Sequence, residues 1–233
     1  MGTLKEDKTC YFSKVQREVL LKLIAHPRIE ENFFLTGGTA LSVFYLNHRL
    51  SNDLDFFTRS ALDLGEIDFW IKTQWLQESA KIKEGPQFLS LLIQEVKVDF
   101  VVDPLSTDEG REKFMFESRH YLLVDTLANI ASNKFCAIVS RTEPKDFIDF
   151  YLILKAFPDF AIADIYQKSR LKDAIFDDPP TAAFQLETGI AFMKETPFLM
   201  PPMFKEVDFQ DFVDFYTNIT KWLYGLFRPG GSV

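Results

Sequence analysis

The sequence has few cysteines and no excess of positive charge. Its two cysteines, Cys10 and Cys136, are too few for a disulfide framework and lack the paired spacing of zinc ligands. The net charge is −8, from 26 Lys and Arg residues against 34 Asp and Glu residues. This excludes a general basic field that would bind nucleic-acid phosphates, so any contact with RNA must depend on a local basic patch.

Long apolar runs and clustered histidines are also missing. No segment approaches the ~18 uninterrupted apolar residues of a membrane-spanning helix, and the opening MGTLKEDKTC lacks the apolar run of a signal peptide. The three histidines are scattered, which argues against a histidine metal site. We therefore expect a soluble cytoplasmic protein with no membrane partner.

The remaining composition is that of a globular protein. The chain has 233 residues, 47% of them hydrophobic, so a sizeable core is available. Phenylalanine is unusually frequent, with 25 residues. Several lie in the C-terminal third, where we expect them to pack in a core or at a domain contact: Phe192, Phe198, Phe204, Phe209, Phe212, Phe215 and Phe227.

Hydrophobic periodicity divides the chain into two parts. In the first part we expect helices over 12–25 and 66–80, a helix that starts after Gly37-Gly38, and strands over 32–36, 53–58, 87–94 and 95–102. In the second part we expect helices over 125–140, 144–156, 161–175, 181–195 and 207–226. The prediction is an α+β (α/β-like) fold, with a small mixed sheet and flanking helices in residues 1–120 and a helical domain in residues 121–233.

Residues 37–57 contain the motifs that most strongly indicate a binding or catalytic site. Gly37-Gly38 at the end of a strand allows a tight turn whose backbone N–H groups can approach a phosphate, and Thr39 adds a hydroxyl donor. Asp53 and Asp55 are two residues apart in a strand and therefore share a face. Two adjacent carboxylates repel each other, and Mg²⁺ bound together with substrate phosphates would relieve that repulsion.

A third carboxylate strengthens this interpretation. An Asp-x-Asp pair alone is more often a solvated strand face, but Asp99 lies opposite the apolar residues of the strand over 95–102. If that strand pairs beside the strand of Asp53 and Asp55, three carboxylates meet on one surface, as in two-metal phosphoryl or nucleotidyl transfer. The sequence alone leaves this pairing open.

The motifs of residues 33–57 resemble the nucleotidyltransferase superfamily, and particularly its AbiEii/AbiGii toxin family. The likeness rests on Gly-Gly-Thr-Ala-Leu, on His-Arg-x-x-Ser before Asp-Leu-Asp-Phe-Phe, and on the later strand with its aspartate. The superfamily's usual Gly-Ser is Gly38-Thr39 here, which keeps a hydroxyl. Arg49 belongs to the matched pattern, where we expect it to position the nucleotide, although it could also cap a helix end or pair with a nearby acid.

A second motif in residues 129–151 supports the resemblance. It has a helical lysine, an arginine seven residues on and a basic-Asp pair that opens the next helix, here Lys134, Arg141, Lys145 and Asp146. Lys134 falls within an apolar stripe, where either snorkelling or binding of a triphosphate would explain it. The resemblance favours the triphosphate and implies that Asp146 is an active-site residue, as a base or as an orienter of a lysine. For Asp149 we expect little beyond a favourable interaction with the helix dipole.

We therefore expect a Mg²⁺-dependent nucleotidyltransferase that binds an NTP between the Gly37–Thr39 turn and Lys134 with Arg141. Asp53 and Asp55 would hold the metal. Asp99 would complete the site, although Asp146 competes with it as the third functional carboxylate. By resemblance, the protein would be the toxin of a toxin–antitoxin or abortive-infection system, with RNA such as tRNA or a protein as acceptor and a cognate antitoxin as partner.

Two other functions fit the same residues. The Phe-rich C-terminal region favours a non-catalytic protein that binds a nucleotide or a partner, but such a protein has no need for clustered carboxylates. A phosphohydrolase would differ only in using water as the acceptor.

Overall fold

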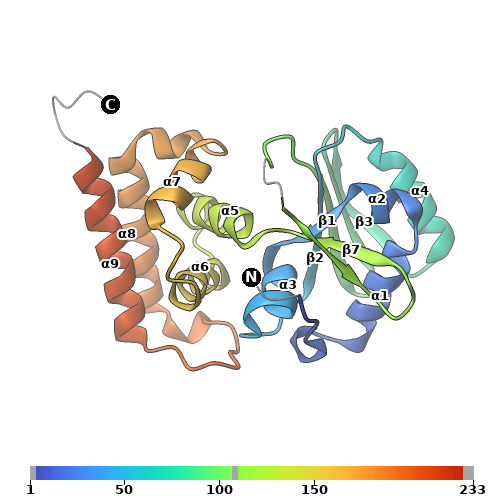
Figure 1. The fold of residues 1–233 in the computed structure, drawn as a ribbon, viewed down its shortest axis with the longest axis horizontal. Coiled ribbons are helices and arrows are strands. Elements are labelled where there is room, and N and C mark those ends of the chain that lie inside the picture. Colours follow the sequence, from blue (N-terminus) through green and yellow to red (C-terminus); the bar gives the residue numbers. More distant parts are fainter. Residues whose placement is uncertain (1–3, 107–109, 228–233) are drawn as a thin grey trace. The chain divides into compact units, whose positions relative to one another are not determined.

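The computed structural model describes residues 4–106 and 110–227. The chain divides into two compact units, one that extends to Ile130 and one that begins at Ala131. Each unit is described by itself. The first contains all seven strands and the second contains helices (Figure 1), which confirms the expected fold class.

The strands form one mixed sheet in the order β3-β4-β5-β2-β1-β7-β6. Parallel pairing joins β2 to β5 and β1 to β7, and the other neighbours are antiparallel. The strand bounds are β1 Phe34–Thr36, β2 Asp53–Thr58, β3 Ser79–Gly85, β4 Phe88–Ile93, β5 Val96–Val102, β6 Glu112–Met115 and β7 Tyr121–Val124.

The two faces of the central strands differ in chemistry. Leu54 and Phe56 are fully buried and lie beside Val98 and Phe100 of β5. The rings of Phe56 and Phe100 stack with centroids 5.4 Å apart, so this face belongs to the core. The opposite face carries the polar residues of β2 and β5, because successive side chains along a strand alternate.

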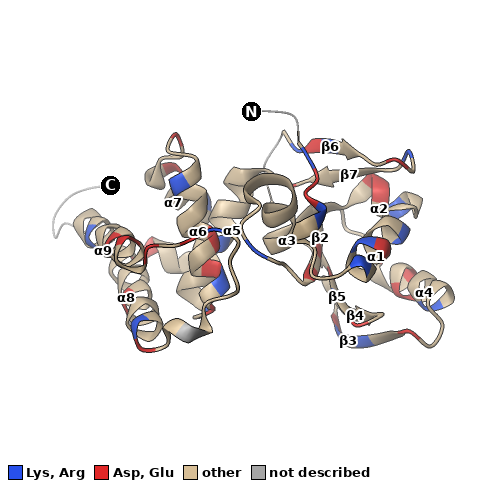
Figure 2. Cartoon of the chain, turned by 90° about the horizontal axis from the view of Figure 1, so that it is seen from below, with Lys and Arg blue, Asp and Glu red and all other residues tan. Residues whose placement is uncertain are grey.

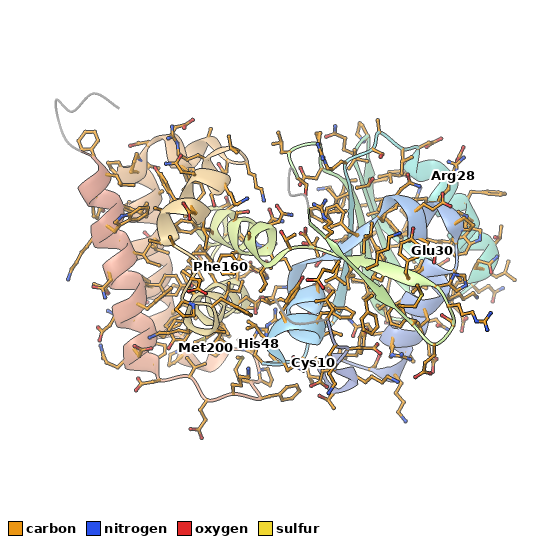
Figure 3. The ribbon with its side chains drawn as sticks, viewed as in Figure 1. Cys10, Arg28, Glu30, His48, Phe160 and Met200 are labelled. Carbon is orange, nitrogen blue, oxygen red and sulfur yellow. The ribbon has the colours of Figure 1, made fainter. Side chains whose placement is uncertain are left out.

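Helices of the first unit cover the sheet and fix its strands. Helix α1 contacts β5, α2 contacts β7, and α4 contacts β4. The side chain of Ser13 caps α1 by accepting a hydrogen bond from the Gln16 N–H at 3.1 Å. On α2, Glu30, which is labelled in Figure 3, accepts a hydrogen bond from the Tyr121 N–H at 2.8 Å. This contact ties the helix to β7. The elements are η1 Lys8–Cys10, α1 Lys14–Ile24, α2 Pro27–Asn32, α3 Gly37–Leu41, the π-helical turn η2 Ser42–Leu46, and α4 Leu64–Gln74.

The second unit is built around aromatic side chains. The rings of Phe135 and Phe150 stack at 4.9 Å, and the Tyr216 hydroxyl donates to the backbone oxygen of Phe147 at 2.5 Å. The helices of this part of the chain are α5 Leu127–Ser140, α6 Pro144–Ala156, α7 Ile162–Arg170, η3 Ala174–Asp177, α8 Pro179–Glu195, η4 Pro197–Leu199 and α9 Phe209–Leu226.

The C-terminal phenylalanines only partly follow the expectation of core packing. Phe212 is fully buried, and Phe209 and Phe215 are half-buried with ring contacts to Phe212 and Tyr151. Three others, Phe192, Phe204 and Phe227, have exposed rings and are not packed in the core. The side chain of Phe198 lies outside the described residues.

Two expected helices end earlier than predicted, and three of the observed strands were not predicted from the sequence. The helix expected over 66–80 ends at Gln74, and strand β3 starts at Ser79. The helix expected over 161–175 ends at Arg170 and is followed by a separate 3₁₀ turn. Strands β3, β6 and β7 were not expected. β3 has almost no buried side chain, and β6 and β7 have only four residues each, too few to show a clear alternation.

Both thiols are protected in the fold, which gives a first testable prediction. Cys10 is fully buried, and burial raises the pKa of Cys136 to about 11. At pH 8 only roughly one Cys136 thiol in a thousand is then a thiolate, the form that reacts. We expect iodoacetamide to leave the folded protein almost unmodified by mass spectrometry, and to alkylate both cysteines in urea. Alkylation of Cys136 at the same rate in the folded and unfolded protein would contradict this environment.

Candidate active site

The Gly-Gly turn lies directly against Asp55. Strand β1 ends at Thr36, and Gly37 then has a φ of +69° as the chain enters α3. A Cβ atom on Gly37 would lie 2.1 Å from Oδ2 of Asp55. Both the left-handed backbone and the close approach therefore require glycine at this position.

Replacement of Gly37 by alanine tests this contact. We expect Gly37→Ala to lower the free energy of unfolding by about 1–3 kcal/mol, because the backbone is strained and Asp55 must move. Gly110→Ala is the matched control, since Gly110 also has a positive φ (+100°) but nothing within 4 Å of its Cβ position. Urea denaturation compares the two variants, and equal losses of stability would show that the contact with Asp55 adds nothing.

Gly38, Arg49 and Thr39 form the other side of this turn. A Cβ atom on Gly38 would lie 2.7 Å from Nη2 of Arg49, and Arg49 is itself buried and donates to the Leu50 backbone oxygen at 2.8 Å. Thr39 is fully buried, and its hydroxyl donates to the backbone oxygen of Asp53. Because the Thr39 proton is used in this way, Thr39 fastens the turn to β2 and does not offer its hydroxyl to a ligand here.

A buried polar network supports the turn from the β1 side. The Thr36 hydroxyl donates to Oδ2 of Asp125 at 2.6 Å, and Nε of Arg111 donates to Oδ1 of the same carboxylate at 3.0 Å. Asp125 is fully buried, and this burial raises its pKa despite the hydrogen bonds and the nearby Arg111. Sequence reasoning missed this group because its members are far apart in the chain.

The structure confirms the strand pairing on which the three-carboxylate interpretation depends. Strand β2 pairs in parallel with β5, with Asp55 opposite Asp99 and Asp53 opposite Lys97. Asp53, Asp55 and Asp99 therefore share one face of the sheet. Asp99 is held there by two contacts, because Ser90 Oγ donates to its Oδ1 at 2.5 Å and Lys97 Nζ to its Oδ2 at 2.5 Å.

Lys97 is an unexpected member of this face. Burial of the ammonium group lowers the pKa of Lys97. The hydrogen bond to Asp99 and the negative charges of Asp99, Asp53 and Asp55 outweigh this effect, so the pKa of Lys97 lies above its ordinary value. Among residues 4–106 and 110–227, no three His, Cys, Asp or Glu side chains are placed to hold one metal ion. Asp99 is bound here by Lys97 and Ser90.

The second unit brings together the residues of the second motif. Lys134 of α5 places its Nζ 2.7 Å from Oδ1 of Asp146 and 2.7 Å from Oδ2 of Asp149, both on α6. Both carboxylates are fully buried, and the Lys134 side chain is only 9% exposed. Acidic and basic positions thus lie side by side on these two helices (Figure 2).

The two remaining residues of the motif lie at the exposed edge of this cluster. Nε of Arg141 donates to Oδ2 of Asp146 at 3.0 Å, and the Arg141 side chain is 54% exposed. Lys145 lies 3.3 Å from Glu143 Oε2. These positions leave the Arg141 guanidinium and the Lys145 ammonium accessible to solvent.

The minor role expected for Asp149 is wrong. Asp146 and Asp149 are three residues apart and therefore share a face of α6. Asp149 is fully buried and paired with Lys134, so it is a full member of the cluster. A dipole interaction needs only a position near the helix start, whereas a buried carboxylate needs a cation. The Lys-Asp-x-x-Asp spacing was the signal that could have indicated this role.

Within the described residues, no helix is long and apolar enough to cross a membrane.

Comparisons with known proteins agree with the two motifs. The family model described as "Nucleotidyl transferase AbiEii toxin, Type IV TA system" matches residues 18–217. An uncharacterized protein of Aquifex aeolicus (strain VF5) is 30% identical over 148 residues, which are 61% of this chain and 66% of that protein. The chain thus spans just under two thirds of the length of this curated relative.

Solved structures share the fold at low sequence identity. JHP933 of Helicobacter pylori is 16% identical, with a TM-score of 0.55 over 95% of this chain and 94% of that chain. MenT4, a nucleotidyltransferase toxin of Mycobacterium tuberculosis H37Rv, is 15% identical, with a TM-score of 0.51 over 90% of this chain and 82% of that chain. Because the family model covers most of the sequence, the chain belongs to the nucleotidyl transferase AbiEii toxin family of type IV toxin–antitoxin systems.

Proposed function

We propose that the protein transfers a nucleotidyl group from an NTP to an acceptor hydroxyl and releases pyrophosphate, with Mg²⁺ as cofactor. The observation that carries the proposal is the face shared by Asp53 and Asp55, with the Gly-Gly turn packed against Asp55. Such a turn beside paired carboxylates suits a triphosphate that binds together with a cation.

The donor set fits a hard divalent cation. Asp53 and Asp55 are oxygen ligands on one face of a rigid sheet, and Mg²⁺ prefers one or two carboxylates together with substrate phosphates. When bound, Mg²⁺ supplies positive charge that offsets the charge developing on the phosphates. The residues of the chain fix the position of the α-phosphate relative to the acceptor, which is the larger part of the work in phosphoryl transfer.

We assign roles to the other predicted site residues from the chemical groups that they present. The backbone N–H groups of Gly37 and Gly38 and the buried Arg49 would position the triphosphate, and Thr39 would hold their turn against β2. For Lys134, Arg141 and Lys145 of the second motif, the family resemblance suggests a part in nucleotide binding. Both oxygens of Asp146 are bound by cations, so orientation of Lys134 suits Asp146 better than service as a base. Asp99 retains further lone pairs with which to orient the acceptor hydroxyl.

The biological role follows from family membership. We propose that the protein acts as a toxin whose acceptor is an RNA, such as tRNA, or a protein, and that a cognate antitoxin neutralises it. We place its action in the cytoplasm, where NTPs and such acceptors are available. Because the net charge is −8, an RNA acceptor would have to be bound by local basic residues.

Transfer of labelled nucleotide tests the proposal. Purified protein is incubated with each α-³²P-labelled NTP, Mg²⁺, and either total cellular RNA or a protein extract, and the products are separated on denaturing gels. We expect one NTP to label one class of acceptor. A folded protein that labels nothing and releases no pyrophosphate with any NTP would support the non-catalytic alternative, and pyrophosphate without a labelled acceptor would support a hydrolase.

A further inference from the structure

Asp125 contacts both ends of the segment that contains the Gly-Gly turn. Before the turn, the Asp125 N–H donates to the Leu35 backbone oxygen at 2.9 Å, and Oδ2 of Asp125 accepts the Thr36 hydroxyl at 2.6 Å. After the turn, the Tyr45 hydroxyl donates to the Asp125 backbone oxygen at 2.7 Å. One residue between β7 and α5 thus holds the chain on both sides of Gly37.

The Asp125 carboxylate is itself held in place by several donors. Its Oδ1 accepts Nε of Arg111 at 3.0 Å and the Thr126 N–H at 3.0 Å, and its Oδ2 also accepts Nδ2 of Asn129 at 2.7 Å. Asp125 and Asn129 are fully buried, and Cζ of Arg111 lies 3.6 Å from the ring centre of Phe34 on β1. A buried carboxylate that accepts several hydrogen bonds is fixed in one position, so Asp125 is a rigid support for the turn.

The direction of the Thr36 hydroxyl also bears on the turn. Thr36 occupies the N-cap position of α3, where a threonine side chain usually accepts a hydrogen bond from the first N–H groups of its own helix. Among the described residues it makes no such cap hydrogen bond, and its hydroxyl donates to Asp125 instead. The Thr36 side chain therefore does not occupy the N–H groups that the proposed triphosphate would bind. Thr36 is also paired with Asp55 across β1 and β2.

We propose that Asp125 is a positioning residue of the nucleotide site, which through Thr36 and Tyr45 fixes the Gly37–Gly38 turn in the conformation that binds the triphosphate. The inference rests on the proposed function for the identity of the ligand, and Asp125 itself does not touch that ligand. A turn that is already ordered loses less entropy when the ligand binds. Loss of these contacts should therefore weaken NTP binding and leave the chemical step nearly unchanged.

A purely structural role is the simplest alternative for Asp125. Buried, hydrogen-bonded carboxylates support many folds without acting on a ligand. A structural defect lowers the fraction of folded protein, so it lowers the apparent kcat and leaves the KM of the remaining active molecules unchanged. Loss of positioning raises the KM for NTP at nearly constant kcat. The two roles therefore differ in which kinetic constant changes.

Thr36→Val tests the proposal with a small change, because a methyl group of similar size replaces the hydroxyl. In the pyrophosphate-release assay we expect the KM for NTP to rise about tenfold, with kcat within about twofold of the natural value. Thr36→Ser keeps the hydroxyl and should restore the natural KM. Thr58→Val is the matched control, since Thr58 is a fully buried threonine of β2 whose Oγ1 accepts the Ser60 N–H at 3.1 Å. This control should leave the KM unchanged.

Amide hydrogen exchange provides a measurement that does not need turnover. By mass spectrometry, Thr36→Val and Tyr45→Phe should each speed exchange in peptides that cover residues 37–41 about tenfold, whereas Thr58→Val should not. Tyr45 is only half-buried, and Tyr45→Phe removes a single hydroxyl. Its KM and exchange therefore decide the question if Thr36→Val does not fold.

The opposing results separate this inference from the proposed function. An unchanged KM in the folded variants would overturn the proposal, and so would a fall in kcat at constant KM or unchanged exchange of residues 37–41. If the natural protein transfers no nucleotide, the proposed function fails. The exchange measurement then decides by itself whether Asp125 fixes the turn.

Discussion

Asp53→Asn is expected to reduce the rate of nucleotidyl transfer by a factor of about 10³ while the protein stays folded. The amide keeps the size of the side chain but removes one of the two negative charges that would hold the metal. The fold should survive because Thr39 and Gln16 contact the backbone oxygen of Asp53, and these contacts do not involve the carboxylate. Initial rates of pyrophosphate release at saturating NTP and Mg²⁺ measure the effect.

A second aspartate variant controls for the loss of charge alone. Asp214 is an exposed residue of α9 that accepts a hydrogen bond from Gln210 at 3.0 Å. Asp214→Asn should therefore retain the natural rate. If Asp53→Asn also keeps more than about a tenth of that rate, the carboxylate face is not the metal site.

Lys134→Met is expected to lower the free energy of unfolding by about 3–5 kcal/mol. Lys134 contacts two fully buried carboxylates, Asp146 and Asp149. Without its ammonium group, Asp149 loses this buried cation, whereas Asp146 keeps its contact with the half-exposed Arg141. A buried carboxylate without a close counter-ion is far more costly than a solvated one. Urea denaturation followed by circular dichroism measures the loss.

An exposed lysine–aspartate pair between α6 and α9 provides the comparison. Lys155 of α6 lies 2.7 Å from Oδ2 of Asp211, and both side chains are nearly half exposed. Lys155→Met should therefore cost no more than about 1 kcal/mol. A similarly small loss for Lys134→Met would mean that water or a rearranged Arg141 compensates the carboxylates, and the cluster would then not be held by Lys134.

Local sequence patterns predict the individual elements well where alternation or capping is strong. The run Asp-Leu-Asp-Phe-Phe-Thr predicts β2 with its observed bounds of 53–58, and Pro144 marks the start of α6. The order of the strands in the sheet cannot be predicted in this way. Alternation shows which side chains of one strand share a face, but it does not show which other strand pairs with that strand. The placement of Asp99 next to Asp55 therefore required the structure.

The charged residues that sequence reasoning missed share one cause. Lys97 alternates with apolar residues, a pattern that also describes a lysine facing solvent. Asp149 lies near a helix start, where a carboxylate needs no further partner. For Asp149 the deciding partner is Lys134 on another helix, α5, and for Lys97 it is Asp99 on the same strand, which Ser90 of β4 also holds. In both cases the position of the residue within its own element does not show whether its side chain is engaged, so the packing of the fold decides it.

The fate of two labels tests the central claim most directly. The protein is incubated with Mg²⁺, the acceptor and the preferred NTP, labelled in parallel reactions on the α- or the γ-phosphate. The account predicts that the α-label moves to the acceptor while the γ-label appears in pyrophosphate, and that Asp53→Asn abolishes both. Transfer of the γ-label to the acceptor, or release of both labels without any labelled acceptor, would contradict nucleotidyl transfer.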